Sequence, residues 1–173
     1  MKKLIKIFSF LLLAGALLTS CQREKFNEFE APSEVTSNLA GTWRLTRVIQ
    51  TDEDAKAKGF IYGDVNVQQM DVTHLFPYTD FRLTLNMNGN TPATFTTTPG
   101  NAPAIIRLSN GSWSLDDPKY PKEITLVNGA VTEKVVLGAY PSAANPSLIL
   151  RLERRDASTN KLLISYNYQF TKQ

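Results

Sequence analysis

Few side chains in this 173-residue chain are of the types that do chemistry. The chain contains one cysteine, Cys21, and one histidine, His74, and it carries an acidic run at Asp52-Glu53-Asp54. Histidine is the commonest general base near neutral pH, and carboxylate oxygens are the ligands that calcium prefers. These three places are therefore where a reaction or a metal site would be expected.

The spacing around these residues does not predict catalysis. Asp71 and Asp80 are only sequence neighbours of His74, and no serine elbow or cysteine nucleophile accompanies it. The run at 52–54 lacks the spaced Asp/Asn pattern and the glycine of a calcium loop, and a lone cysteine gives neither a disulfide nor a zinc spacing. We predict a protein that is not an enzyme, with no cofactor and no metal, in which His74 is a satisfied or solvent-facing loop histidine and residues 52–54 form the solvated end of the first strand.

Cys21 follows a segment that is typical of a secretory signal. Lys2 and Lys3 give a basic start, and an apolar stretch runs from Ile7 to Leu18. As a helix, this stretch covers roughly 18 Å, well short of the ~30 Å hydrocarbon core of a bilayer. We therefore predict a signal peptide over residues 1–20 and not a membrane span.

The four residues Leu18-Thr19-Ser20-Cys21 resemble the lipobox of bacterial lipoproteins, in which signal peptidase cuts before a cysteine whose sulfur has been acylated. The resemblance implies lipid attachment at Cys21, where two or three acyl chains, at about 0.8 kcal/mol per buried methylene, anchor a protein permanently. It also implies the bacterial cell envelope, with the outer membrane as the expected site and both its periplasmic and its exterior face left open. The alternative for Cys21 is an idle or buried thiol.

The net charge argues against nucleic acid as a partner. The full chain has a formal charge of +3, but Lys2, Lys3 and Lys6 lie in the predicted signal, and without them 16 basic residues face 16 acidic ones. No stripe of Lys and Arg interleaved with aromatic residues is present to bind phosphates.

The sequence predicts a tether followed by one domain. Residues 22–34 are charged, contain Pro32 and show no periodicity, so we assign 21–38 to the lipidated cysteine and a flexible tether that reaches roughly 55 Å when extended. Residues 39–173 have the length of a single domain with one core.

Apolar residues alternate with polar ones almost everywhere after residue 40. Trp43, Leu45 and Ile49 share one parity, and Leu162, Ile164, Tyr166, Tyr168 and Phe170 share another. This period of two predicts half-buried strands. We predict strands near 41–50, 80–87, 93–98, 104–108, 111–116, 122–127, 131–138, 147–154 and 162–171.

Three Asn-Gly pairs, at Asn88-Gly89, Asn110-Gly111 and Asn128-Gly129, predict tight hairpin turns, because this dipeptide tolerates positive φ angles. A meander of hairpins favours an all-β, eight-stranded (or nine-stranded) antiparallel up-and-down barrel, which removes both exposed sheet edges. A β-sandwich is the alternative, because its strands alternate in the same way.

The longest gap between predicted strands, residues 51–78, is rich in apolar side chains. Long irregular segments in compact domains are usually functional or contain a short element of their own. We interpret this segment as a cap on the barrel, with a helical turn or a short extra strand within Val67–Phe76. It can serve equally as a ligand gate or as a structural flap.

Three short motifs resemble lipocalins. Gly41-Thr42-Trp43 opens the first strand with the Gly-X-Trp signature of that family, and Asn110–Leu115 resembles the Gly-X-Trp-X-Leu strand of small lipocalin-like lipoproteins of unknown function in Gram-negative bacteria. Residues 165–172 are similar to the closing strand of those proteins. The resemblance implies an eight-stranded barrel that holds an apolar molecule and carries no catalytic residues.

On this basis we expect five aromatic residues to contact a ligand, with core packing as an equal alternative for each: Trp43, Phe81, Trp113, Tyr166 and Tyr168. An inward-facing Trp or Tyr needs a partner for its N–H or O–H group.

Two functional hypotheses follow. The first is a membrane-anchored lipocalin-like lipoprotein that binds a small apolar or amphipathic molecule in its barrel. The second is a non-enzymatic interaction or accessory protein of the envelope, which binds a protein partner through its outer surface or loops. A lined cavity favours the first, and an exposed apolar patch favours the second.

Overall fold

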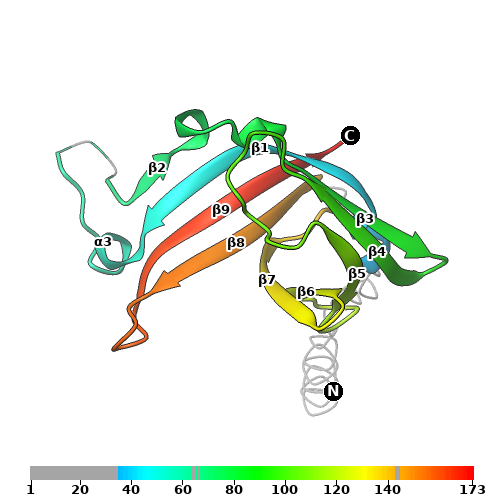
Figure 1. Cartoon of the computed structure of the whole chain (residues 1–173). Coiled ribbons are helices and arrows are strands. Elements are labelled where there is room, and N and C mark those ends of the chain that lie inside the picture. The colour runs from blue at the N-terminus through cyan, green and yellow to red at the C-terminus, as the bar shows by residue number, and fades with distance from the viewer. Residues whose placement is uncertain (1–34, 64, 66, 143–144) are drawn as a thin grey trace, which may run out of the picture. The chain divides into compact units, whose positions relative to one another are not determined.

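The computed structural model describes residues 35–63, 65, 67–142 and 145–173 (Figure 1). The predicted signal, the predicted lipid-attachment residue Cys21 and the predicted tether up to residue 34 lie outside the described residues. The described residues all belong to one contact unit, Ser33–Gln173, which has its own hydrophobic core.

Eight antiparallel strands form a closed barrel, because each strand pairs with the next and the last pairs with the first. A ninth strand, β2 (Gln69–Asp71), adds to the edge of β1. The predicted barrel is therefore confirmed over the sandwich. The barrel strands are β1 (Gly41–Asp52), β3 (Arg82–Asn88), β4 (Thr91–Thr98), β5 (Asn110–Leu115), β6 (Glu123–Asn128), β7 (Val131–Ala139), β8 (Ser147–Arg155) and β9 (Leu162–Lys172).

The two halves of β1 have different neighbours. β3 pairs only with Gly41–Arg44, whereas β2 pairs with Ile49–Thr51, and β9 follows β1 along most of its length. Two short 3-10 helices, η1 (Thr73–Leu75) and η2 (Tyr78–Asp80), link β2 to β3 beside β1. A short strand and helical turns therefore do lie in the long apolar segment, as predicted.

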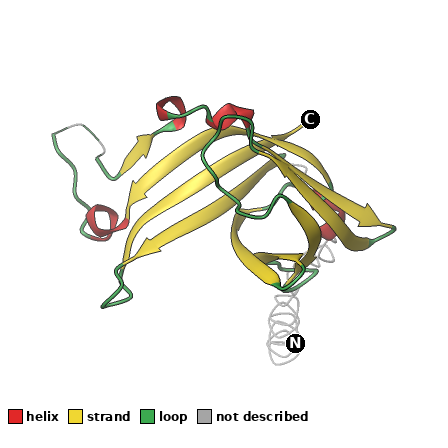
Figure 2. Cartoon of the chain, in the orientation of Figure 1, coloured by secondary structure: helices red, strands yellow, loops and turns green. Residues whose placement is uncertain are grey.

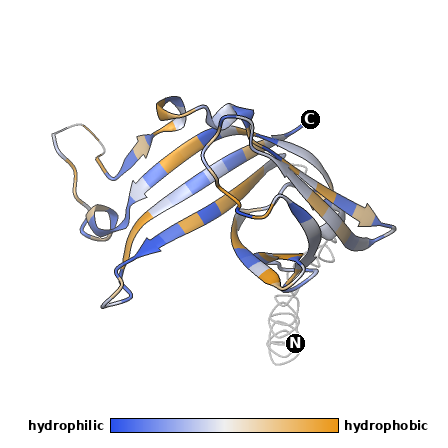
Figure 3. Ribbon diagram, in the orientation of Figure 1, coloured by the Kyte–Doolittle hydropathy of each residue, from blue (hydrophilic) through white to orange (hydrophobic). Residues whose placement is uncertain are grey.

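The inner face of the barrel forms the core, and Figure 3 shows the alternation of apolar and polar residues along β1, β8 and β9. The prediction that Ile49 shares the buried face of β1 with Trp43 and Leu45 is wrong. The pairing of β1 with β9 shifts register between Leu45 and Arg47, so Val48 is buried and Ile49 is only half-buried. The buried apolar residues of the strands are Trp43, Leu45, Val48, Leu83, Leu85, Phe95, Trp113, Ile124, Leu126, Leu148, Leu150, Tyr168 and Phe170.

A short helix, α2 (Val35–Leu39), packs at the end of the barrel where β1 begins. Val35 and Leu39 are buried in the core, and the Leu39 carbonyl accepts a 2.8 Å hydrogen bond from Trp43 Nε1. The tether predicted to extend to residue 38 is therefore too long, because its last residues are part of the folded domain.

Two of the three Asn-Gly predictions are correct. Gly89 and Gly129 have φ angles of 60° and 59° in the β3–β4 and β6–β7 turns. The third is wrong, because Gly111 lies within β5, where a Cβ atom would come 2.0 Å from the Val127 carbonyl oxygen of β6. Glycine is needed there for the close approach of two strands and not for a turn.

The strand predicted at 104–108 is also wrong, because residues 99–109 form an irregular segment between β4 and β5. In this segment a side-chain carboxylate accepts two backbone hydrogen bonds that a neighbouring strand would otherwise accept. The N–H groups of Arg107 and Leu108 donate hydrogen bonds of 3.0 and 3.3 Å to Glu133. We call this segment the 99–109 segment.

Candidate functional site

The barrel wall opens between β7 and β8. The ladder between these strands ends at Val136 and Arg151, and beyond it residues 131–135 pair with β6 while residues 152–155 pair with β9. Figure 2 shows the two strands diverging toward this end. A hollow of ≈ 230 Å³ lies at the divergence, which we call the β7–β8 opening. Its lining residues are Ile105, Glu133, Lys134, Val135, Val136, Leu150, Arg151, Leu152, Glu153 and Tyr168.

The inner part of the β7–β8 opening is apolar and belongs to the barrel interior. Leu150 lies opposite Tyr168 in the β8–β9 ladder, and Val135 lies opposite the buried Ile124 in the β6–β7 ladder. Residues directly opposite each other in an antiparallel pair share one face, so these side chains point inward. Ile105 of the 99–109 segment closes one side.

Glu133 is an acidic residue on the inner face. It lies opposite the buried Leu126, and its side chain is only 13% exposed. One carboxylate oxygen accepts from the N–H groups of Arg107 and Leu108, and the other lies 3.7 Å from Arg107 Nε. Glu133 therefore holds the 99–109 segment against β7, beside the opening.

Three tyrosine rings lie side by side next to the opening. The Tyr168 ring stacks on Tyr166 and makes an edge contact with Tyr78, both with centroids 6.2 Å apart. Burial, with smaller contributions from the Tyr78 and Tyr166 phenols, raises the pKa of Tyr168 to about 12. Burial also raises the pKa of Tyr78. The Tyr78 and Tyr168 phenols therefore stay neutral at physiological pH.

The other aromatic residues predicted to contact a ligand lie in the packed core. Phe81 is 0% exposed and makes an edge contact with Phe170. Trp113 is buried and donates a 2.7 Å hydrogen bond from Nε1 to the Asn86 carbonyl. Trp43 is also buried, although it borders a shallow depression beside Lys172 at the α2 end. Of the five predicted residues, the structure brings Tyr168 to the β7–β8 opening and Tyr166 to the ring beside it.

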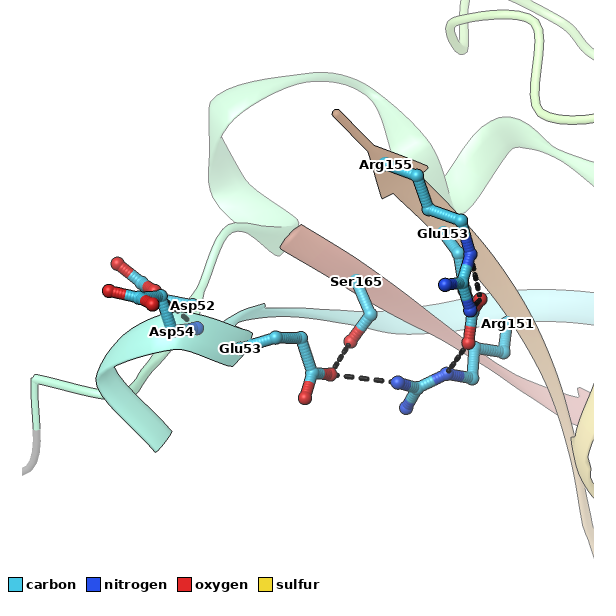
Figure 4. A network of polar contacts seen from close by, with 7 residues as sticks. All are labelled: Asp52, Glu53, Asp54, Arg151, Glu153, Arg155 and Ser165. Atoms are coloured by element: carbon cyan, nitrogen blue, oxygen red, sulfur yellow. Dashed lines mark hydrogen bonds and ion pairs between the residues drawn. The ribbon is translucent and has the colours of Figure 1, made fainter. Parts of the chain in front are cut away.

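A polar network covers the outer face of β8 and β9 next to the opening (Figure 4). Glu53 opens the short helix α3 (Glu53–Ala57) and accepts from Ser165 Oγ at 2.5 Å and from Arg151 Nη2 at 2.8 Å. Arg151 Nε also contacts Glu153 at 3.1 Å, and Arg155 binds the other oxygen of that carboxylate at 2.6 Å. The Ser165 hydrogen bond, followed by Arg151, lowers the pKa of Glu53.

The prediction that the acidic run at 52–54 is only the solvated end of a strand is therefore incomplete. Asp52 caps α3 by accepting from the N–H groups of Asp54 and Ala55. The Glu53 side chain points toward the network on the outer face of β8 and β9 and is only 12% exposed. Asp54 forms ion pairs with Lys58 and Lys161.

His74 is exposed in η1, and the nearby Asp71 carboxylate binds Thr73 and Arg47. In the described ranges, no group of three or more His, Cys, Asp or Glu residues is arranged to hold a metal ion. Over those same residues, no helix has the length and apolar character needed to cross a bilayer.

The segment between α3 and β2 exposes a set of large apolar side chains, and Figure 1 shows this segment projecting away from the barrel strands. In the second half of the segment that we interpreted as a cap, Val72 and Tyr78 are buried, whereas Leu75 and Phe76 are exposed. We call the exposed set the apolar loop; its members are Phe60, Ile61, Tyr62, Val65 and Val67, together with Met70 of the adjoining strand β2.

Comparison with protein families gives a match over residues 21–137 to the domain of unknown function DUF5004. The match covers more than half of the chain. The chain belongs to the DUF5004 family. Comparison with curated proteins and with solved structures finds no match.

The DUF5004 match ends in β7, so it includes Ile105, Glu133 and Val135 but not the residues that β8 and β9 contribute to the opening. Sequence reasoning missed Glu133 and Arg151. A signal for Glu133 was present, because it occupies the apolar parity of β7 between Val131 and Val135. Arg151 and Ser165 carry no such signal, since both lie on the outer, polar parity of their strands.

Proposed function

We propose that this DUF5004 protein is a membrane-anchored, lipocalin-like lipoprotein that binds a small apolar or amphipathic molecule through the β7–β8 opening. The observation that carries the proposal is the hollow of ≈ 230 Å³ at the end of the β7–β8 ladder, lined on its inner side by Leu150, Val135 and Tyr168. Small-molecule sites are typically concave and mostly apolar, with a few polar groups, and this lining has that composition.

The closed packing at the α2 end supports entry from the side. Trp43, Phe81 and Trp113 fill that part of the barrel, and the two indole N–H groups already have backbone partners. A second, shallower hollow of ≈ 490 Å³ shares Ile105, Glu133, Lys134 and Leu152 with the opening and continues it outward. Together they provide room of the order that ligand pockets have, roughly 300–1,000 Å³.

The anchoring part of the proposal is supported by the residues around Cys21. The Leu-Thr-Ser-Cys motif ends a short apolar segment, and the family match starts at the same cysteine. An acylated Cys21 would hold the barrel at the envelope, with the outer membrane as the proposed site. A Cys21→Ser chain is expected to leave the membrane fraction, and a chain that still sediments with membranes as the unmodified protein does would refute anchoring at this residue.

Binding can be tested with two matched tryptophan substitutions. Leu152 lies at the opening and is 40% exposed, whereas Leu163 is 38% exposed and does not line it. We expect the Ser33–Gln173 unit to bind the neutral dye N-phenyl-1-naphthylamine, Leu152→Trp to weaken this binding at least tenfold, and Leu163→Trp to leave it unchanged. Equal binding by both variants would place the site elsewhere, and no dye binding by the unmodified unit would remove the ligand-binding function.

The apolar loop supports a second candidate function, a docking element for a protein partner in the envelope. Tyr62 is 74% exposed and Ile61 is 60% exposed on a segment that projects from the barrel. Exposed apolar side chains that form a contiguous patch mark sites of interaction with a protein or membrane. A photo-crosslinking residue at position 62 should then form a defined adduct in cells, whereas the same residue at the exposed Ser158 should not; absence of an adduct at position 62 would count against this candidate.

A further inference from the structure

We propose that the ligand of the β7–β8 opening is an uncharged molecule whose hydroxyl or carbonyl group hydrogen-bonds to the Tyr168 hydroxyl. This inference rests on the proposed ligand-binding function and narrows its ligand class. Two independent features of the opening support this inference. The charged side chains that line it are all ion-paired, and the hydroxyl of the buried Tyr168 has no hydrogen-bond partner among the described residues.

Every charged side chain that lines the opening has an ion-pair partner among the described residues. Lys134 Nζ lies 2.8 Å from Glu123, and Arg151 contacts both Glu53 and Glu153. An anionic ligand would therefore have to break an existing pair to find a cation, and its charge would otherwise lose hydration without compensation.

The acidic side chains at the opening also have hydrogen-bond or ion-pair partners within the domain. Glu133 accepts from two backbone N–H groups and lies near the Arg107 guanidinium, while Glu153 binds Arg151 and Arg155. A cationic ligand would compete with these contacts. The electrostatics of the opening thus favour a molecule without net charge.

Tyr168 supplies the polar contact. The residue is only 6% exposed, and no hydrogen bond joins its hydroxyl to any described residue. Among the described residues no fully buried side-chain nitrogen or oxygen lacks a partner, so the Tyr168 oxygen must border accessible space, and the opening is a hollow that this residue lines. A phenol can both donate and accept, so it suits an alcohol or a carbonyl compound.

The surroundings of Tyr168 favour a neutral partner for this group. The raised pKa shows that the phenol resists ionisation where it lies, between Tyr78 and Tyr166 and against an apolar wall. A neutral hydrogen bond loses little by desolvation in such a place, whereas a carboxylate brought there would lose much of its hydration. The apolar wall formed by Val135, Leu150 and Leu152 would hold the rest of an amphipathic molecule.

The test compares probes with the same alkyl chain and different head groups. Decan-1-ol, decanoate and decylammonium compete at neutral pH for N-phenyl-1-naphthylamine bound to the Ser33–Gln173 unit. Decan-1-ol is expected to displace the dye at concentrations at least tenfold lower than either charged probe. Displacement by decanoate or decylammonium that equals that of decan-1-ol would overturn the inference, even though ligand binding itself would stand.

Two conservative substitutions assign the hydrogen bond. Tyr168→Phe should lower the affinity for decan-1-ol about five- to tenfold more than it lowers the affinity for the dye, because one neutral hydrogen bond to the alcohol is lost. Tyr120→Phe, at an exposed position, should change neither. If Tyr168→Phe binds decan-1-ol as tightly as the unmodified unit, Tyr168 is not the recognition group. If the unmodified unit binds no dye, both the proposed function and this inference are wrong.

Discussion

Ser165 Oγ, in β9, donates a 2.5 Å hydrogen bond to the Glu53 carboxylate at the start of α3 (Figure 4). Ser165 is fully buried although it lies on the outer face of the barrel, because α3 covers it there. The same carboxylate binds Arg151, a residue at the β7–β8 opening. Glu53 therefore connects a surface helix to the wall of the candidate site.

Removal of the Glu53 carboxylate should destabilise the domain. Glu53→Ala leaves the buried Ser165 hydroxyl without its acceptor, and an unsatisfied buried hydroxyl costs about 1–3 kcal/mol. Urea unfolding measures the change. Glu123→Ala is the control, because its partner Lys134 is 63% exposed and such pairs contribute roughly 0–1 kcal/mol. Equal losses in the two variants would contradict the importance of the Ser165 contact.

The Glu53 carboxylate also predicts a pH dependence. Its pKa in the folded protein is below the ordinary value of 4.5, because Ser165 and Arg151 stabilise the charged form. A group with a lowered folded pKa contributes stability above its unfolded pKa and loses it as the pH falls through the folded value. The stability difference between the unmodified domain and Glu53→Gln should therefore be constant near neutral pH and shrink below about 4.5. A difference independent of pH from neutral to strongly acid solution would refute this.

Tyr168 predicts a loss of stability in alkaline solution. Its pKa is about 12 in the folded protein against 10.0 ordinarily, because burial disfavours the phenolate. Between these values the unfolded chain releases a proton that the folded chain keeps, so stability falls as pH rises from about 10 to about 12. Unfolding curves across this range should show a smaller fall for Tyr168→Phe. Ultraviolet titration should show that the same variant lacks a late tyrosinate step.

Gly111 and Gly129 each follow an asparagine, yet they should respond very differently to alanine. The Cβ of Gly111→Ala would meet the Val127 carbonyl at 2.0 Å, and we expect a loss above roughly 4 kcal/mol or failure to fold. A Cβ atom at Gly129 would have no heavy atom within 4 Å beyond its chain neighbours, so only the positive φ of 59° opposes alanine, at about 1–2 kcal/mol. Thermal unfolding of both variants distinguishes them, and similar melting temperatures would contradict the structure.

The apolar loop should be dispensable for stability. Ile61 and Tyr62 are 60% and 74% exposed, so replacing both by serine removes few buried contacts. We expect the free energy of unfolding to change by less than about 0.5 kcal/mol, as for ordinary surface substitutions. A large loss in urea unfolding would show that the loop packs on the domain in solution.

Much of the barrel was predictable because its strands obey a local rule. The alternation at Leu148, Leu150 and at Tyr166, Tyr168, Phe170 assigns the inner face correctly, since one buried face forces a period of two. Two of the three Asn-Gly turns were also predictable from the positive φ angles that they require.

What the sequence did not predict depends on contacts between distant residues. The register shift near Thr46 moves Val48 inward, and no local pattern marks it. The hydroxyl of Ser165 is buried by a helix 112 positions away. The β7–β8 opening arises where a ladder stops at Val136 and Arg151, a property of two strands together and not of either sequence.

The pairing of β1 with β9 has a consequence for biosynthesis. Gly41–Asp52 leaves the ribosome well before its main neighbour, Leu162–Lys172, because seven other strands are made between them. The barrel therefore cannot close until β9 has been made, and until then β1 and β8 each expose a long unpaired edge. A nonsense mutation shortly before residue 162 would make that transient state permanent, producing an aggregation-prone fragment for proteases to remove.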